Sequence, residues 1–170
     1  MKIRRVQDEG LRVSGLLSGD LRLLELIPVH ADPGGTPSAE ERLFQEPVRD
    51  EETQGGETLN NDWRDHVMPE LRTEFSRQLE VLTEDLKRAR SSGGKDGPRF
   101  EFVIPFENVE AWYGALNQAR LVMQERYRFP ETESPEALIG LLHSPNLKPF
   151  LTSRFYVQLQ SALLDLAMDR

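Results

Sequence analysis

A glycine inside a helix-forming run is the feature that most constrains how this chain can fold. Residues 111–122 read AWYGALNQARLV, and Gly114 follows the aromatic residues Trp112 and Tyr113 in that run. A glycine in a helix interior costs about 1 kcal/mol relative to alanine. A helix that accepts this cost usually needs a neighbouring backbone to pass close to it. We therefore expect another part of the chain to approach this helix closely at Gly114.

Length and composition indicate a soluble globular protein. The chain has 170 residues, of which 38% are hydrophobic and 29% are charged, and this suits a single domain over residues 1–170. Asp20, Arg22 and Glu25 interrupt the apolar segment 16–27, so we expect neither a signal peptide nor a membrane-spanning helix. The chain has no cysteine, which excludes disulfides, thiolate zinc sites and iron–sulfur clusters. We expect a cytoplasmic protein with no cofactor and no membrane partner.

The negative charge is concentrated in one segment. The net charge is −8, and residues 31–60 alone carry eight acidic residues against Arg42 and Arg49, a net of −6. Proline and glycine are frequent at 33–37 and 55–56, and few side chains in the segment can be buried. We expect residues 31–60 to form an acidic, mobile loop in which Ser38 caps a short helix ending near Gln45. A solvated linker is favoured over an acidic docking segment, and both interpretations stay open.

The remaining pattern predicts an α+β fold that is predominantly α, a helical bundle with a small antiparallel sheet. A β-hairpin is expected from Lys2–Val6 and Leu11–Leu17, and the strand at residues 100–104 should pair with it. Apolar residues at spacings of three and four predict two long helices, at 60–90 with a kink near Pro69 and at 106–128. Other helices are expected at 19–27 (capped by Ser18 and ended by Pro28), 136–142 and 147–170, with a loop at 91–98.

The C-terminal helix has two apolar faces. One contains Phe155 or Tyr156, Leu159, Leu163 and Leu166, and the other contains Val157, Leu164 and Met168. Such a helix either lies at the centre of the bundle or is partly covered by a second subunit. Central burial is the more common arrangement, but the second face makes a homodimer through this helix possible.

One group of residues has metal-ligand spacing. Asp62, His66 and Glu70 lie four residues apart, so a helix would project them along one face as ligands for a divalent cation. Arg64 and Asp65 lie between them, and a solvated, charge-paired helix face explains the same pattern more simply. We favour the charge-paired face and retain the metal site as the alternative.

Asn117 and Arg120 are the polar residues of most interest for ligand binding. Arg120 falls one turn after the core-facing Leu116. If Arg120 points inward, it needs a buried partner, and Glu74 or Glu84 of the preceding long helix could supply one. The first interpretation is an ion pair that fixes the helix register. The alternative is a polar pocket in which Asn117 and Arg120 bind a carboxylate or phosphate.

Part of the sequence resembles a known protein family. The run from Trp112 to Val122 is similar to the signature W-x-G-A-L-N-x-x-R-L-x of a bacterial family, domain of unknown function two-thousand-seventeen. Residues 41–47 (ERLFQEP) and 64–72 also follow the order of that family. The resemblance implies a small, mainly helical cytoplasmic protein with no established catalytic residues. Family members are often encoded near a Clp-protease adaptor, which implies a link to stress response or proteostasis.

These observations favour a non-enzymatic, protein-binding regulatory or adaptor domain whose partner the sequence does not identify. A small-ligand-binding protein or metal-dependent enzyme with a pocket at Asn117 and Arg120 is the alternative. The net charge of −8 argues against nucleic acid as a partner. Some basic surface is supplied by a local cluster of Arg4, Arg5, Arg12 and Arg22 and by Lys87, Arg88 and Arg90.

Overall fold

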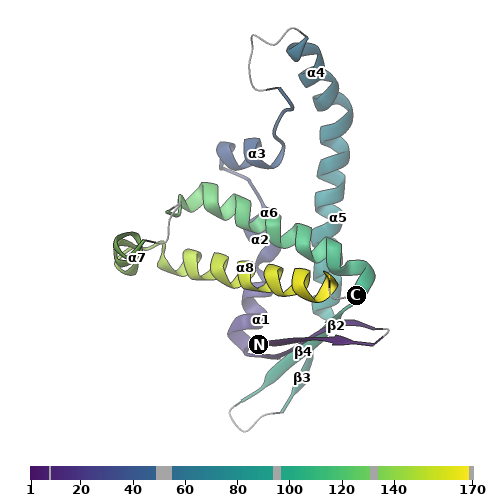
Figure 1. Ribbon diagram of the computed structural model, residues 1–170, viewed down its shortest axis with the longest axis vertical. Helices are drawn as coiled ribbons and strands as arrows, with labels where there is room; N and C mark the ends of the chain where they lie inside the picture. Colours follow the sequence, from purple (N-terminus) through teal and green to yellow (C-terminus); the bar gives the residue numbers. More distant parts are fainter. Residues whose placement is uncertain (8, 49–54, 94–96, 131–133, 169–170) are drawn as a thin grey trace.

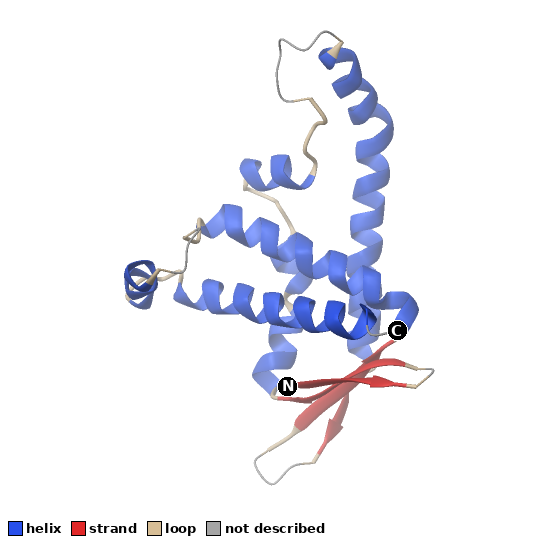
Figure 2. Ribbon diagram, in the orientation of Figure 1, coloured by secondary structure: helices blue, strands red, loops and turns tan. Residues whose placement is uncertain are grey.

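The protein is a helical domain with one small antiparallel sheet (Figures 1 and 2). A computed structural model describes the chain from 1 to 170 except residues 8, 49–54, 94–96, 131–133 and 169–170. The predicted α+β, mainly helical fold class is confirmed. Within the described residues, no helix combines the length and the apolar character needed to cross a membrane.

The sheet has four strands in the order β1-β2-β4-β3. They are β1 Lys2–Val6, β2 Gly10–Leu16, β4 Arg99–Ile104 and β3 Arg90–Ser92. The predicted hairpin and its pairing with the later strand are confirmed, whereas β3 falls largely within the expected loop 91–98 and was not predicted. Gly10 has φ +138°, and a Cβ there would lie 2.0 Å from the carbonyl oxygen of Ile104. Only glycine therefore allows β2 and β4 to approach this closely.

Two short helices follow the hairpin, α1 Ser18–Glu25 and α2 Ile27–Ala31. The N-cap of α1 is Leu17, whose backbone N–H donates to Asp20 Oδ2 at 2.9 Å. The prediction of Ser18 as the cap was therefore wrong by one residue. The prediction that Pro28 ends the helix was also wrong. Pro28 lies in the first turn of α2, where its missing N–H breaks no helical hydrogen bond.

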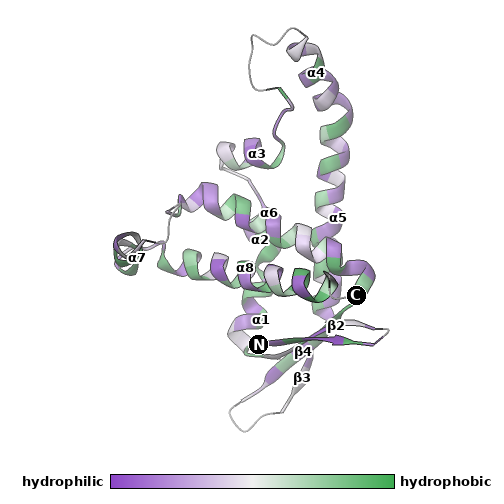
Figure 3. Cartoon of the chain, viewed as in Figure 1, coloured by the Kyte–Doolittle hydropathy of each residue, from purple (hydrophilic) through white to green (hydrophobic). Residues whose placement is uncertain are grey.

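The predicted long helix is present but begins earlier and contains a π-helical turn. It comprises α4 Gly56–Asp62, the π turn Trp63–Val67 and α5 Met68–Lys87. The wider turn directly precedes Pro69, which cannot donate the hydrogen bond of a regular helix. Figures 1 and 3 show α4 and the first part of α5 extending from the body as an arm along which polar and apolar residues alternate. Leu82 and Leu86 are buried at the other end, whereas Leu59 and Val67 on the arm are exposed.

The core lies where α6 Val109–Tyr127 packs against α8 Leu147–Met168 and the sheet. Helices α6 and α8 run side by side, and α7 Pro135–Leu142 lies at the far end of α8 (Figure 1). A 3₁₀ turn, Phe106–Asn108, leads into α6. The core residues of these elements include Leu11, Phe102, Trp112, Leu116, Met123, Tyr156, Leu159 and Leu163. The predicted core-facing apolar stripes of α6 and α8 are therefore confirmed.

The second apolar face of α8 is only partly covered. Leu164 is 41% exposed and Val157 is half-buried, while the side chain of Met168 lies outside the described part of the structure. Two further residues, Ile139 of α7 and Leu151 of α8, are 58% and 57% exposed. Because α7 adjoins the N-terminal end of α8 and Leu164 lies near the C-terminal end, exposed apolar side chains occur at both ends of this helix (Figure 1).

A side chain, not a backbone as predicted, approaches the helix at Gly114. A Cβ at Gly114 would lie 2.2 Å from Gln78 Oε1 of α5. Gln78 is held there because it accepts from Gln118 Nε2 at 2.8 Å and donates to Glu74 Oε1 at 3.1 Å. Gly114 therefore makes room for an amide pair that joins α5 to α6.

The acidic segment contains an ordered helix, α3 Pro37–Leu43, that packs on α6. Its N-cap is Thr36, so the prediction of Ser38 as the cap was wrong by two residues. Arg126 of α6 donates to the carbonyl oxygen of Asp32 at 2.6 Å, and to that of Gly34 at 3.5 Å. The expected mobility of 31–60 stays a prediction, and residues 49–54 of that segment lie outside the described residues. These contacts nevertheless anchor residues 32–43 to α6.

Candidate functional site

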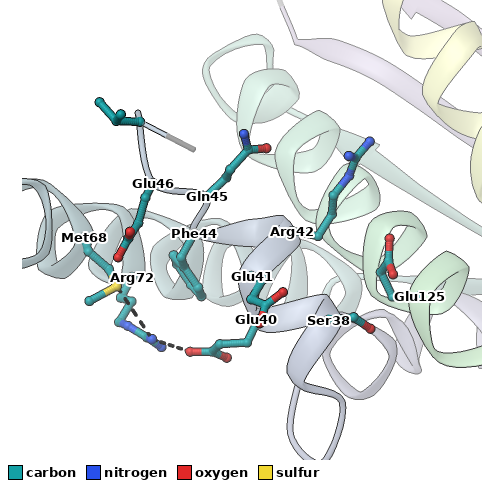
Figure 4. Close-up of a pocket in the computed structure, with 11 residues that line it drawn as sticks. Ser38, Glu40, Glu41, Arg42, Phe44, Gln45, Glu46, Met68, Arg72 and Glu125 are labelled. Carbon is teal, nitrogen blue, oxygen red and sulfur yellow. Dashed lines mark hydrogen bonds and ion pairs between the residues drawn. The ribbon is translucent and has the colours of Figure 1, made fainter. Parts of the chain in front are cut away.

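The largest hollow of those we describe is an open groove between α3, α5 and the end of α6 (Figure 4). Its volume is about 710 Å³. The lining consists of acidic, basic and apolar side chains in close proximity: Ser38, Glu40, Glu41, Arg42, Phe44, Gln45, Glu46, Val48, Met68, Arg72 and Glu125. Residues 38–48 of the acidic segment form most of one wall, so the segment that appeared to be a linker builds this site.

Aromatic and ionic contacts hold the groove in shape. The ring of Phe44 lies against Phe75 of α5, with 5.6 Å between the ring centres. The guanidinium of Arg72 lies over the ring of Phe44, 4.2 Å from the ring centre. Arg72 Nη2 also donates to the carboxylate of Glu40 on α3. These contacts join α3 and the residue that follows it to α5, and they give the groove its shape.

The groove has more carboxylates than its arginines neutralise. Arg64 Nε donates to Glu46 Oε1 at 2.5 Å, and this contact raises the pKa of Arg64. Arg72 is occupied by Glu40. Within the described residues, Glu41 and Glu125 have no ion-pair partner, and Arg42 is the one remaining cation of the lining. Carboxylates beside an apolar floor are suited to a ligand with both cationic and apolar groups.

The predicted metal residues lie on the arm beside this groove. Asp62 and His66 line a second hollow with Leu59, Trp63 and Val67, but Glu70 does not belong to that lining. In the part of the chain that the structure describes, no three His, Cys, Asp or Glu residues lie close enough together to hold a metal ion. The side chains of Asp62, His66 and Glu70 are all exposed on the arm.

The same hollow contains the one buried polar side-chain atom for which the described residues supply no hydrogen-bond partner, Trp63 Nε1. A buried indole N–H normally finds an acceptor. This hollow adjoins the groove, since Pro47 of its lining lies between groove residues Glu46 and Val48.

Arg120 is half-buried, and its partner is an amide rather than the predicted acid. Arg120 Nη1 donates to Oε1 of the buried Gln160 of α8. Burial, with a smaller contribution from the nearby Arg154, lowers the pKa of Arg120. The predicted acids are engaged elsewhere, because Glu74 binds Arg77 and Glu84 binds Lys87.

Asn117 is half-buried and does not supply the amide that faces the core. That amide belongs to its neighbour Gln118, which is buried and bonded to Gln78. One residue rotates a helical side chain by about 100°, so the sequence pattern identified the correct turn and the wrong residue. The hollows described here are not lined by Asn117 or Arg120.

The sequence analysis missed a buried carboxylate at Asp85, which is 1% exposed. Asp85 Oδ2 accepts from Trp112 Nε1 at 3.0 Å, and both carboxylate oxygens accept from Asn108 Nδ2 at 3.0–3.1 Å. Arg88 Nη1 donates to Asp85 Oδ1 at 3.2 Å. The sequence signal that could have revealed this buried acid is its place in the apolar stripe of α5, directly before Leu86 and three residues after Leu82.

Comparison with known families gives one match. A family model described as a domain of unknown function, DUF2017, matches residues 6–166. The chain belongs to this family. No match to a curated protein or to a solved structure was found.

In this DUF2017 domain, the run from Trp112 to Val122 makes contacts that hold the helices together. Trp112 binds the buried carboxylate of Asp85, Gly114 makes room for Gln78, and Arg120 binds Gln160. Each contact joins α6 to α5 or α8. The run therefore fixes how these helices pack, and the candidate site lies elsewhere, in the groove of α3 and α5.

Proposed function

We propose that this DUF2017 protein is a non-enzymatic, protein-binding domain of the bacterial cytoplasm, with a regulatory or adaptor role. Its groove between α3 and α5 would receive a basic segment of a partner protein. The observation that carries the proposal is a preformed groove with an apolar floor at Phe44 and Met68 and unpaired carboxylates at Glu41 and Glu125. The resemblance to a family encoded near a Clp-protease adaptor favours a partner in stress response or proteostasis.

Charge supports a basic partner. The groove is built largely by the segment 31–60, which carries a net charge of −6 of the total −8. Such a concentration attracts cations over a distance of about 10 Å at moderate salt. The apolar floor favours a segment in which lysine or arginine alternates with an aliphatic or aromatic residue, since apolar contact supplies affinity and charge supplies orientation.

The alternative of a small-ligand-binding protein or a metal-dependent enzyme gains less support. It requires Asn117 and Arg120 to present free polar atoms to one pocket, but one Arg120 donor is already engaged by Gln160. It also requires Asp62, His66 and Glu70 to converge, and only the first two share a hollow.

The proposal is tested by selecting binders from a random peptide library on the immobilised protein. We expect the selected peptides to combine basic and apolar residues. The double variant Glu41→Gln, Glu125→Gln should bind them about fivefold more weakly, because each exposed ion pair contributes up to about 1 kcal/mol. The control Glu80→Gln, Glu136→Gln removes the same charge from exposed positions outside the groove lining and should bind normally. Equal weakening in both double variants would contradict a groove-specific site.

We further propose that two copies pair through the outer face of the C-terminal helix. Support comes from the exposed Leu164 and the half-buried Val157, together with the exposed Ile139 of α7. Burial of a large aliphatic side chain contributes about 1.5–3 kcal/mol, and an isologous dimer buries each residue twice. Light scattering at micromolar concentration should give twice 19.5 kDa for the parent protein and a monomer for Leu164→Glu. A dimer lost in Ile139→Glu but retained in Leu164→Glu would assign the interface to α7 instead.

A further inference from the structure

A further hollow, whose lining is rich in arginine, lies on the outer side of the sheet at the end of α5. Its volume is about 440 Å³, and it is lined by Glu9, Arg12, Arg88, Arg90, Glu101, Phe102, Val103 and Pro105. We propose that this hollow, which we name the arginine pocket, binds a small phosphate-bearing anion through Arg12, Arg88 and Arg90. The proposal is independent of the proposed function of the groove.

The strand pairing brings these cations together. Phe102 and Ile104 of β4 are buried, so the alternating residues Glu101 and Val103 lie on the outer face of the sheet. Arg12 of β2 is the register partner of Val103, and Arg90 of β3 is the partner of Glu101. The pocket therefore gathers side chains from three adjacent strands.

The sheet also places like charges directly opposite each other. Arg4 of β1 is the register partner of Arg12. Directly opposed like charges destabilise a strand pair. In a chain with a net charge of −8, this local excess of arginine is not a consequence of overall composition. A bound anion would relieve the repulsion, which gives the arrangement a physical reason.

Arg88 is the best-positioned of the three arginines because a buried carboxylate orients it. Its Nη1 donates to Asp85 Oδ1, and Asp85 is fixed from the core by Trp112 and Asn108. The Arg88 side chain is nevertheless 67% exposed. A guanidinium has five N–H donors, so one bond to Asp85 leaves others for a ligand. Arginine held in this way is well suited to planar, two-point recognition of phosphate oxygens.

The acidic residues Glu9 and Glu101 determine which anions the arginine pocket can bind. Arg12 Nη2 lies 3.7 Å from Glu9 Oε2, a long ion pair whose side chains are 47% and 60% exposed. Exposed pairs of this kind are weak, so an anion with several charges can displace Glu9 from Arg12. Glu101 stays opposite Arg90. Three arginines face the carboxylates of Glu9, Glu101 and Asp85, so the pocket gains a net positive charge only when Glu9 moves away. A compact ligand with two or more phosphate charges is better able to displace Glu9 than a monoanion is.

Inorganic triphosphate is the probe for the test, with citrate, a carboxylate anion of lower charge, as the comparison. Isothermal titration at constant ionic strength should show saturable, one-site binding of triphosphate and at least tenfold weaker binding of citrate. Arg88→Gln and Arg12→Gln should each weaken triphosphate about tenfold, equivalent to about 1.4 kcal/mol. Glu9→Gln should tighten it about threefold, because it removes the competing carboxylate. Arg22→Gln is the control, since Arg22 is an exposed arginine paired with Glu25 outside the pocket.

Arg12→Gln leaves the Asp85 contacts intact, so it tests the site even if Arg88→Gln perturbs folding. Circular dichroism of each variant checks that the fold is retained. The proposal is overturned by any of three results: no saturable binding at millimolar triphosphate, equal binding of citrate, or equal weakening in Arg12→Gln and Arg22→Gln.

Discussion

Replacement of Asp85 by asparagine should strongly destabilise the domain. The Asp85 carboxylate is 1% exposed and accepts hydrogen bonds from Trp112, Asn108 and Arg88 at 3.0–3.2 Å. An amide has one acceptor oxygen in place of two, so its NH₂ group must face at least one of these donors. A hydrogen bond to a charged group contributes about 1.5–3 kcal/mol. The loss of one such bond and the weakening of the others together amount to about 3 kcal/mol.

Urea denaturation followed by circular dichroism measures this change. For a chain of this length, about 3 kcal/mol corresponds to a fall of about 6–12 °C in the melting temperature. The control is Glu84→Gln, because Glu84 is the preceding residue, has the same charge and is exposed in its contact with Lys87. Its unfolding midpoint should be unchanged. An unchanged midpoint in Asp85→Asn, or an equal loss in Glu84→Gln, would refute the view that Asp85 organises the contact between α5 and α6.

Three further changes test other parts of the fold. Gly114→Ala should destabilise the folded protein by about 1 kcal/mol, because the cost of displacing the hydrogen-bonded Gln78 amide outweighs the gain in helix propensity. In a Gln78→Ala background the same substitution should stabilise the protein, and equal effects in both backgrounds would contradict the steric argument. Burial, with a smaller contribution from Arg126, lowers the pKa of His30 below its ordinary 6.5. The folded state then binds fewer protons than the unfolded state, so the free energy of unfolding should fall as the pH drops below about 6.5. Urea titrations of His30→Gln should show a flatter pH dependence of this free energy, and an unchanged dependence would assign the effect to other groups. Deletion of residues 34–37 should lower the melting temperature by about 4–8 °C, since it removes the Thr36 and Gly34 contacts of Arg126 and the first residue of α3. Calorimetry measures the change, and an unchanged melting temperature would contradict a stabilising role for this segment.

The sequence predicted the elements whose hydrophobic spacing is regular. Helix α6 buries Trp112, Leu116 and Met123 at the predicted spacing, and strand β4 pairs with the hairpin because an isolated strand cannot satisfy its backbone. Strand β3 escaped prediction because its three residues, Arg90–Ser92, have no strand composition and border a glycine-rich loop. The sheet partner, rather than local preference, makes this segment a strand.

The binding sites depended on contacts that no local pattern contains. The groove exists because Glu40 binds Arg72, 32 residues further along the chain, and because Phe44 packs on Phe75. The arginine pocket gathers Arg12 and Arg90 from strands at opposite ends of the first hundred residues. Sequence reasoning therefore recognised the acidic segment as unusual but interpreted it as a linker, because its burial depends on partners far away in the chain.

The proposed function is tested most directly by amide chemical shifts of the isotope-labelled protein during titration with a selected basic peptide. We predict that the shifted amides cluster on residues 38–48 and on the part of α5 around Met68 and Arg72, which line the groove. The variant Glu41→Gln, Glu125→Gln should show the same residues shifting at higher peptide concentration. Shifts confined to α7 and α8, or spread evenly over the exposed acidic residues, would contradict the assignment of the groove as the partner-binding site.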